Sequence, residues 1–199
     1  MPSRVVGIVG SARKGMNTDS LVSAALDGAR SAGAEVEKIH LNDMQIRPCQ
    51  ACKEFPKDRY CWFQDGMETV YRALEEADAV VVGTPAYFGC ISAQLKLMID
   101  RCNCLAEMTT APDDKVTFRT RMGKRKKGVF IWVAHLSKDV SIAHVPVKLW
   151  CRFANIELAD TIVFTGSDRR DSAAARDESL RRAFEAGARL ATMGHCDAR

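Results

Sequence analysis

Short apolar runs and helical patterns alternate along most of this chain. Runs of apolar residues such as Val5–Val9 and Val129–Val133 lack a polar face, which is typical of strands buried on both sides. Between the runs, apolar residues recur at helical spacing, as at Met67, Val70 and Leu74. The predicted strands are residues 5–9, 35–41, 79–84, 129–133 and 160–164. The predicted helices are residues 18–32, 67–77, 92–100, 145–155 and a closing helix through 180–191.

Strands that alternate with helices predict a parallel sheet covered on both faces, because each crossover returns over the sheet. We therefore expect an α/β fold in three layers, a doubly wound five-stranded parallel sheet. No internal repeat or linker interrupts the pattern, so residues 1–199 are expected to form a single domain. Ligands of such sheets lie outside the carboxyl ends of the strands, where the strand order reverses. If the first and third strands are neighbours, the loops at residues 10–18 and 84–90 face the same site.

The composition of the 199 residues, with 47% hydrophobic and 27% charged residues, is that of a globular protein. No apolar run approaches the roughly 20 residues that span a bilayer, and the first residues do not resemble a signal peptide. We therefore expect a cytoplasmic protein outside the membrane, whose eight cysteines are free thiols, metal ligands or redox groups. The net charge of +4 permits anionic ligands. The basic run 124–127 is expected to be solvated surface without nucleic acid, since no nucleic-acid-binding motif accompanies it.

The first loop changes abruptly from the buried strand to small, polar and cationic residues. Ser11, Asn17 and Thr18 can donate hydrogen bonds to phosphate oxygens, and Arg13 can add a charge-assisted pair. The helix that follows begins with unpaired N–H groups and a partial positive charge. The loop therefore favours an anion site, and the alternative is an ordinary strand-to-helix turn with a capping Asn or Thr.

Two common nucleotide motifs do not match this loop. Gly10 and Gly15 have the spacing of a P-loop, but Met16 and Asn17 stand where Lys and Ser or Thr would bind phosphate and magnesium. The chain contains no G-x-G-x-x-G sequence, so a dinucleotide fingerprint is not supported. A terminal phosphomonoester is the anion that the remaining donors suit.

The second loop places aromatic residues at a strand end. Pro85 and Gly89 favour a bent backbone, and Tyr87 and Phe88 between them can contact a planar ring. Taken alone, such aromatic residues more often cap the core beneath the loop. Together with a phosphate site at the same edge, they predict a ligand with a phosphate at one end and a flat ring at the other, as in FMN.

Both loops resemble motifs of one known family. Residues 10–18 (Gly-Ser-Ala-Arg-Lys-Gly-Met-Asn-Thr) are similar to the phosphate loop of the NADPH-dependent FMN reductase and iron–sulfur flavoprotein family, which has a flavodoxin-like fold. Residues 85–89, with the helical segment 92–101 after them, are similar to its isoalloxazine loop and following helix. The likeness keeps its order and spacing over residues 4–101. After the fourth strand the family has a glycine-rich loop, where this chain has Ala134–Asp139.

The resemblance implies bound FMN that NAD(P)H reduces and that a quinone, free flavin or similar small-molecule acceptor reoxidises. The implied reaction requires no catalytic acid or base. The resemblance also implies a homodimer or homotetramer. The alternative is a flavin-binding electron-transfer module, such as an iron–sulfur flavoprotein, that serves a partner protein. The residues expected to contact FMN are Ser11, Arg13, Gly15, Met16, Asn17, Thr18, Pro85, Ala86, Tyr87, Phe88, Gly89, His135 and Ser137.

One predicted loop, residues 42–65, is rich in thiols. Its cysteines are Cys49, Cys52 and Cys61. Their spacing resembles the cluster motif of the iron–sulfur flavoproteins, but Phe55 stands where that motif has another cysteine. A [4Fe–4S] cluster normally takes four thiolates, so one ligand is missing unless Cys102 or Cys104 supplies it. We expect reduced thiols in a loop that covers the flavin or a subunit contact, with a cluster, or a zinc site that includes His40, as alternatives.

Overall fold

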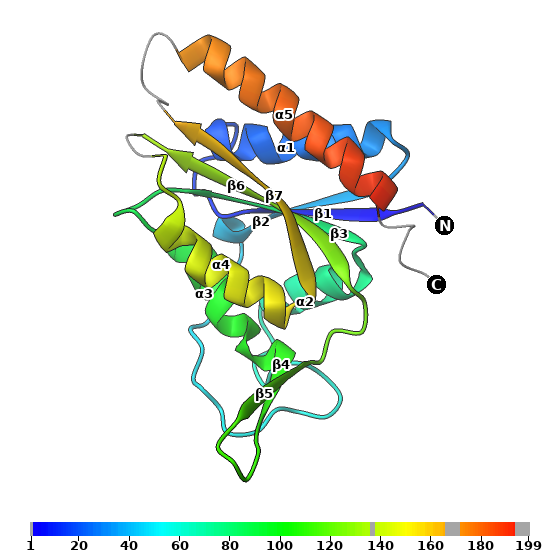
Figure 1. Cartoon of the computed structure of the whole chain (residues 1–199), viewed down its shortest axis with the longest axis vertical. Helices are drawn as coiled ribbons and strands as arrows, with labels where there is room; N and C mark the ends of the chain where they lie inside the picture. Colours follow the sequence, from blue (N-terminus) through cyan, green and yellow to red (C-terminus); the bar gives the residue numbers. More distant parts are fainter. Residues whose placement is uncertain (1, 136–137, 166–171, 194–199) are drawn as a thin grey trace.

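The computed structural model describes residues 2–135, 138–165 and 172–193, with the side chains of the last stretch from residue 176 onward. Its main sheet has five parallel strands in the order β2-β1-β3-β6-β7 (Figure 1). The strands are β1 (Arg4–Val9), β2 (Glu35–His40), β3 (Ala79–Pro85), β6 (Lys126–Ala134) and β7 (Ile156–Thr165). Because the order reverses between β1 and β3, the predicted doubly wound parallel sheet is confirmed.

Helices cover both faces of the sheet, as Figure 1 shows. One layer contains α1 (Asn17–Ser31) and α5 (Ser172–Met193), and the other contains α2 (Met67–Glu76), α3 (Ala93–Arg101) and α4 (Ser141–Phe153). Successive residues of a strand point to opposite faces, so each strand serves two cores. Val5 and Val9 pack in the core with α1 and α5, whereas Val6 and Ile8 pack in the core with α2, α3 and α4.

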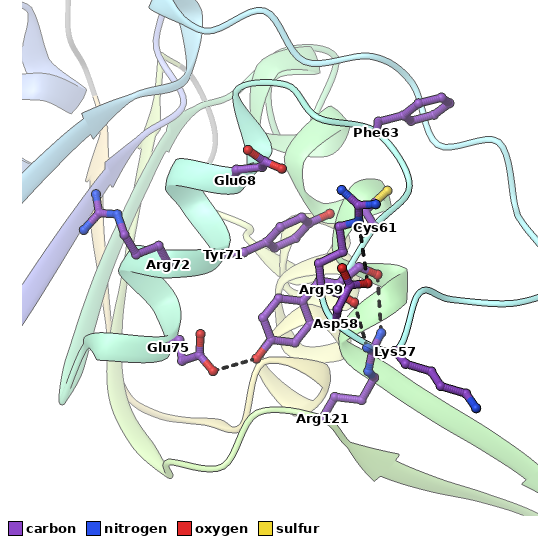
Figure 2. A pocket seen from close by; sticks show the side chains of 11 residues that line it. Lys57, Asp58, Arg59, Cys61, Phe63, Glu68, Tyr71, Arg72, Glu75 and Arg121 are labelled. Atoms are coloured by element: carbon purple, nitrogen blue, oxygen red, sulfur yellow. Dashed lines mark hydrogen bonds and ion pairs between the residues drawn. The ribbon is translucent and has the colours of Figure 1, made fainter.

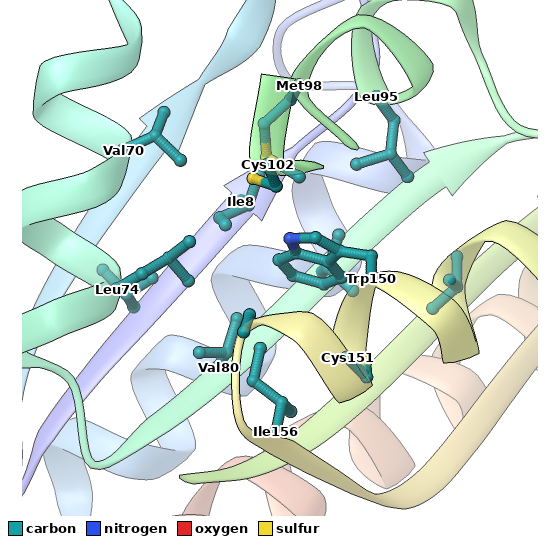
Figure 3. Packing of buried hydrophobic residues seen from close by; sticks show 14 of the residues in the cluster. Ile8, Val70, Leu74, Val80, Leu95, Met98, Cys102, Trp150, Cys151 and Ile156 are labelled. Carbon is teal, nitrogen blue, oxygen red and sulfur yellow. The ribbon is translucent and has the colours of Figure 1, made fainter. Parts of the chain in front are cut away.

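The core beneath α2, α3 and α4 contains three buried cysteines, Cys102, Cys104 and Cys151. Cys102 and Cys151 lie in the same cluster as Met98 and Trp150 (Figure 3). Burial raises the pKa of both thiols, that of Cys151 to about 12, because a thiolate there would lose its hydration. We therefore regard these two cysteines as structural thiols that remain protonated.

Residues 105–127, which are mostly polar and basic, contain an antiparallel hairpin that sequence reasoning did not predict. Strand β4 (Ala106–Thr110) pairs with β5 (Val116–Thr120) outside the main sheet, and Figure 1 shows the hairpin projecting from the layer of α2, α3 and α4. Its strands alternate apolar and polar residues over only about four positions each, and most of their side chains are exposed. Two short 3-10 helices, η1 (Leu41–Asp43) and η2 (Cys102–Leu105), carry no periodic signal.

The prediction that the whole basic run 124–127 is solvated is wrong for one residue. Lys126 is only 1% exposed, and its ammonium donates to the carbonyl oxygens of Lys124 and Ala154. Burial, together with the positive charge of Lys124, lowers the pKa of Lys126 to about 8. The run looks uniformly polar in the sequence, but β6 begins within it and turns this side chain inward.

Helices α1 and α5 pack with their backbones in contact at two glycines. A Cβ on Gly28 would lie 1.9 Å from the carbonyl oxygen of Phe184, and a Cβ on Gly187 would lie 1.7 Å from that of Ala25. This close approach brings the two helices together over β1 and β3. Within the described ranges, neither of these helices nor any other is long and apolar enough to cross a membrane.

Candidate ligand site at the strand ends

The loops that follow β1 and β3 meet the end of β6 at one edge of the sheet, as the strand order requires. Gly10 N–H donates to the carbonyl oxygen of Gly83 at 2.8 Å, and the Ser92 hydroxyl donates to the carbonyl oxygen of Gly10 at 2.6 Å. Ala86 N–H donates to the carbonyl oxygen of Val133 at 2.7 Å. Hydrogen bonds to the backbone therefore join the predicted phosphate loop, the predicted ring loop and the end of β6.

Gly10 has no room for a side chain at this junction. A Cβ there would lie 3.0 Å from the Cβ of Leu95, 3.0 Å from the Ser92 hydroxyl oxygen and 3.1 Å from the carbonyl oxygen of Gly83. Ser92 also caps α3, because its hydroxyl accepts the N–H of Leu95. The glycine therefore allows the N-terminus of α3 to approach the first loop closely.

The first loop presents polar groups around the start of α1. Ser11 is buried, and its hydroxyl accepts the N–H of Arg13 at 3.1 Å. Thr18 is buried and Asn17 is half-buried in the first turn of α1, whereas Arg13 is exposed. Met16 occupies the N-cap position, and its side chain provides no cap. The first-turn N–H groups of α1 are therefore available to an anion, as at other helix N-termini that bind phosphate.

A buried carboxylate is hydrogen-bonded to the same loop. Asp19 Oδ2 accepts the N–H of Gly15 at 2.7 Å, while Oδ1 lies 2.9 Å from Lys38 Nζ and 3.1 Å from His40 Nε2. Burial by itself would raise the pKa of Asp19, but the hydrogen bonds from Gly15 and Lys38 and the nearby charges outweigh it and lower that pKa. Gly15 has a φ of +69°, so this bond holds a turn that glycine alone adopts easily. We infer that Asp19 anchors the loop to β2.

Replacing Asp19 with asparagine is expected to weaken FMN binding, although Asp19 is itself negatively charged. The change removes the charged acceptor of the Gly15 N–H and of Lys38, a loss of about 1.5–3 kcal/mol, or roughly 10- to 150-fold in affinity. Calorimetric titration of the apoprotein with FMN measures the change. Asp27→Asn, at an exposed position of the same helix, is the control. Tighter binding by Asp19→Asn would instead show that charge repulsion, not loop geometry, is the main effect of this carboxylate.

The second loop forms a tight turn with two residues at its tip. Tyr87 and Cys90 exchange backbone hydrogen bonds of 2.9 Å, and Phe88 and Gly89 between them have φ values of +51° and +74°. Positive φ at both central positions is the type I′ pattern, which strains a residue that has a Cβ. Phe88 is fully exposed and Tyr87 is 49% exposed, so these rings do not cap the core. Both are available to a ligand or to another molecule.

The remaining predicted contacts lie at the ends of β3 and β6. Pro85 and Ala86 are half-buried where β3 ends, and His135 is exposed directly after β6. Ser137 lies outside the described residues. The structure therefore brings the first two loops and His135 to the same edge of the sheet, whereas the prediction for Ser137 stays open.

Sequence reasoning missed the residues that tie these loops together. Thr84 accepts the N–H of Ser92 at 3.0 Å, Ser92 bonds to Gly10, and Asp19 bonds to Gly15. A serine just before a helical pattern and an acidic residue in a first turn are both signals of a helix start. Such signals locate the cap, but they do not identify the distant loop that it contacts.

The three loop cysteines do not fit a four-thiolate cluster. Cys49, Cys52 and Cys61 line one cavity of about 20 Å³. In the part of the chain that the structure describes, however, no group of three or more His, Cys, Asp or Glu side chains is placed to hold a metal ion. Phe55, at the position of the missing cysteine, packs against the core.

The candidates for a fourth ligand are also engaged elsewhere. Cys102 lies in the core, and the thiol of Cys104 donates to the Tyr71 hydroxyl and to a backbone carbonyl. His40 is a ligand of the alternative zinc site, but its Nε2 lies 3.1 Å from Asp19 Oδ1. The donor set required for a cluster or for that zinc site is therefore not assembled.

The fold and the site together define a class: doubly wound α/β proteins with an anion loop after β1 and an aromatic turn after β3. A family model described as NADPH-dependent FMN reductase matches residues 3–150. This chain belongs to that family.

Two curated relatives are iron–sulfur flavoproteins of archaea. The protein of Methanosarcina thermophila is 32% identical over 125 residues, which are 63% of this chain and 65% of that protein. An iron–sulfur flavoprotein of Methanocaldococcus jannaschii is 39% identical over 98 residues, which are 49% of this chain and 51% of that protein. The chain therefore spans between about half and two thirds of the length of these relatives.

Solved structures with low identity share the fold. A flavone reductase superposes with a TM-score of 0.72 at 23% identity, covering 97% of this chain and 63% of the other. The NAD(P)H:quinone oxidoreductase from Methanothermobacter marburgensis gives a TM-score of 0.69 at 19% identity, covering 96% and 100%. A flavodoxin from the Archaea gives a TM-score of 0.57 at 13% identity, covering 96% and 98%. The predicted flavodoxin-like fold is thereby confirmed.

Proposed function

We propose that this protein binds FMN at the ends of β1 and β3, reduces it with NAD(P)H and passes the electrons to a small-molecule acceptor such as a quinone or free flavin. The observation that most directly supports the proposal is the pair of hydrogen bonds that join Gly10 to Gly83 and to Ser92. This junction sets an uncapped helix N-terminus beside an exposed aromatic turn. These two features are complementary to the phosphate and the flat ring of FMN. Family membership and the likeness to a quinone oxidoreductase support the same activity.

The chain's own residues have binding and positioning roles in this proposal. Ser11, Asn17 and Thr18 donate to the phosphate together with the first-turn N–H groups of α1, and Arg13 adds a charge-assisted pair. Residues 85–89 position the ring and leave one of its faces open to the reactants. FMN supplies the hydride chemistry when bound, so no side-chain acid or base is required.

We also propose that the protein forms a homodimer or homotetramer. On α4, Ile142, Val145 and Leu149 are 62%, 62% and 55% exposed, and their spacing places them on one face of the helix. Exposed apolar faces of this kind favour contacts between protein molecules. The fully exposed Phe88 adds a further apolar contact at the end of β3.

The visible absorption spectrum of the anaerobically purified protein, before and after NADPH, tests the function. A flavin spectrum that bleaches, followed by recovery on adding a quinone, is the expected result. A flavin that NADPH and NADH leave oxidised, but that a partner protein reduces, would replace the enzyme with an electron-transfer module. A colourless protein that FMN cannot reconstitute would contradict the proposed site.

The valine variant of Thr18 is expected to bind FMN about tenfold more weakly. The change keeps the shape of the side chain but removes one hydroxyl donor to the phosphate, and a hydrogen bond to a charged group contributes about 1.5 kcal/mol. Quenching of FMN fluorescence by the apoprotein measures the affinity. Ser31→Ala removes a hydroxyl at the far end of the same helix and should change nothing. An unchanged affinity in Thr18→Val would show that this hydroxyl does not contact the phosphate.

A further inference from the structure

The cysteine loop, residues 45–66, contains thiols that the proposed flavin chemistry does not use. Cys52 is exposed, and Cys49 and Cys61 are half-buried. By contrast, Cys102 and Cys151 are buried in the core. Reaction with a dissolved oxidant requires access to the sulfur, so the loop thiols are the reactive candidates of this region.

One buried arginine fixes the loop near its two ends. The side chain of Arg101, on α3, is 1% exposed and donates to the Asp65 carboxylate oxygens at 2.6 and 3.2 Å. It also donates to the carbonyl oxygen of Arg47 at 2.8 Å. The backbone N–H of Arg47 donates in turn to Asp65 at 2.9 Å. Charge-assisted bonds of this kind hold the loop geometry with protein groups alone.

A second arginine fixes the middle of the loop. Arg121 donates to the carbonyl oxygens of Pro56, Arg59 and Tyr60 at 3.1, 2.9 and 3.3 Å. Figure 2 shows it beside this segment, at a hollow of about 430 Å³ between the loop and α2. Its guanidinium also lies 5.6 Å from the ring centroid of Phe55. Phe55, which occupies the position of the missing cluster cysteine, is therefore part of an arginine–aromatic contact.

Cys61 is engaged in the same network. Its sulfur lies 3.4 Å from Nη2 of Arg101 and accepts a hydrogen bond from it. Phe55 packs against the core, and Cys61 is hydrogen-bonded to Arg101. Of the positions in the cluster-like motif, Cys49 and Cys52 therefore remain as a C-x-x-C pair. This spacing is the one found in dithiol redox motifs.

The backbone between these two cysteines is tightly bent. Ala51 has a φ of +49°, which a residue with a Cβ adopts rarely, and its N–H lies 3.5 Å from the sulfur of Cys49. The turn therefore brings both cysteines to the same small cavity.

We propose that Cys49 and Cys52 form a reversible redox dithiol in a loop that is held without metal. Its oxidant is a low-molecular-weight disulfide such as oxidised glutathione. The exposed Cys52 thiolate attacks one sulfur of that disulfide, which forms a mixed disulfide and releases one thiol. Cys49 then attacks the sulfur of Cys52, which forms the Cys49–Cys52 bond and releases the second thiol. The protein loses two protons and two electrons, and the two released thiols carry them. This proposal is independent of FMN binding.

Thiol mapping across glutathione buffers of increasing oxidation tests the pair. The full chain is equilibrated in each buffer, alkylated in denaturant so that the buried thiols also react, and digested with trypsin, which leaves both cysteines in the peptide Ile39–Lys53. We expect this peptide to become two hydrogens lighter and to lose both alkyl groups. The number of alkylatable thiols should fall from eight to six, and dithiothreitol should restore it. A peptide that stays doubly alkylated under oxidising conditions would overturn the proposal.

Three variants separate this pairing from its alternatives. Cys49→Ser should trap glutathione on Cys52, and Cys52→Ser should abolish the light peptide. Cys61→Ser is the matched control and should leave the pair intact, because serine still accepts from Arg101. A disulfide between the peptides Ile39–Lys53 and Tyr60–Arg72 would show that Cys61 is the true partner. Stoichiometric iron and sulfide in the anaerobically purified protein would show that these cysteines bind a cluster instead.

Discussion

Replacing Asp65 with alanine is expected to lower the free energy of unfolding by about 3–5 kcal/mol, because it leaves a buried guanidinium unpaired. The side chains of Arg101 and Asp65 are 1% and 10% exposed, and their charged atoms approach to 2.6 Å. Without the carboxylate, the acceptors that Arg101 retains among the described residues are the Arg47 carbonyl and the Cys61 sulfur. Chemical denaturation measures the loss.

The contribution of this ion pair also depends on pH. Burial alone would raise the pKa of Asp65, but hydrogen bonds from Arg101 and from the backbone N–H groups of Arg47 and Met67 outweigh it and lower that pKa. A carboxyl whose pKa is lowered by folding contributes stability above its unfolded pKa of about 3.9. That contribution is lost as the pH falls through the lower folded value. The Asp65→Ala variant should therefore lack this part of the acid dependence.

An exposed ion pair on the same helix is the control for Asp65. Lys96 and Asp100 lie 2.7 Å apart on α3 with side chains 49% and 44% exposed, so Asp100→Ala should cost only about 0.3–0.5 kcal/mol. The double variant Asp65→Ala with Arg101→Leu should recover part of the stability, since no buried charge remains. If Asp65→Ala is as stable as Asp100→Ala, the buried pair is not what stabilises the cysteine loop.

Replacing Gly187 with valine is expected to destabilise the protein by about 3 kcal/mol, at the upper end of the usual cost of overpacking. A Cβ at this position would lie 1.7 Å from the carbonyl oxygen of Ala25, which belongs to the backbone of α1 and cannot rotate away. Helices α1 and α5 would have to separate, which would open the core that includes Leu26 and Leu190. This cost exceeds the roughly 1 kcal/mol by which glycine in a helix interior is less favourable than alanine.

Thermal and chemical unfolding of Gly187→Val measure this effect. Gly123→Val is the control, because nothing lies within 4 Å of a Cβ at that position. Because α1 begins at the candidate phosphate loop, the variant should also bind FMN more weakly. A stable Gly187→Val protein with unchanged affinity would contradict the close contact between these helices.

Local patterns were enough to predict the main sheet and the position of the candidate site. The apolar runs at residues 79–84 and 129–133 lie in β3 and β6 of the structure, and the loop at residues 10–18 lies at the carboxyl end of β1. The hairpin of β4 and β5 was missed because its strands are short and mostly exposed, so their brief alternation of apolar and polar residues does not stand out within a polar segment. The burial of Lys126 was missed because a charged run does not show which residue a strand turns inward.

By itself, the sequence determined the parallel α/β sheet, its two polar loops and the likeness to FMN reductases, because all three depend on short-range order along the chain. Only the tertiary structure decided which residues distant in the sequence contact one another. Asp19 reaches Lys38 and His40 on β2, Ser92 reaches Gly10, and Arg101 reaches Asp65. Such contacts arise from the packing of elements distant in sequence, and neither residue of a pair carries a local sign of its partner.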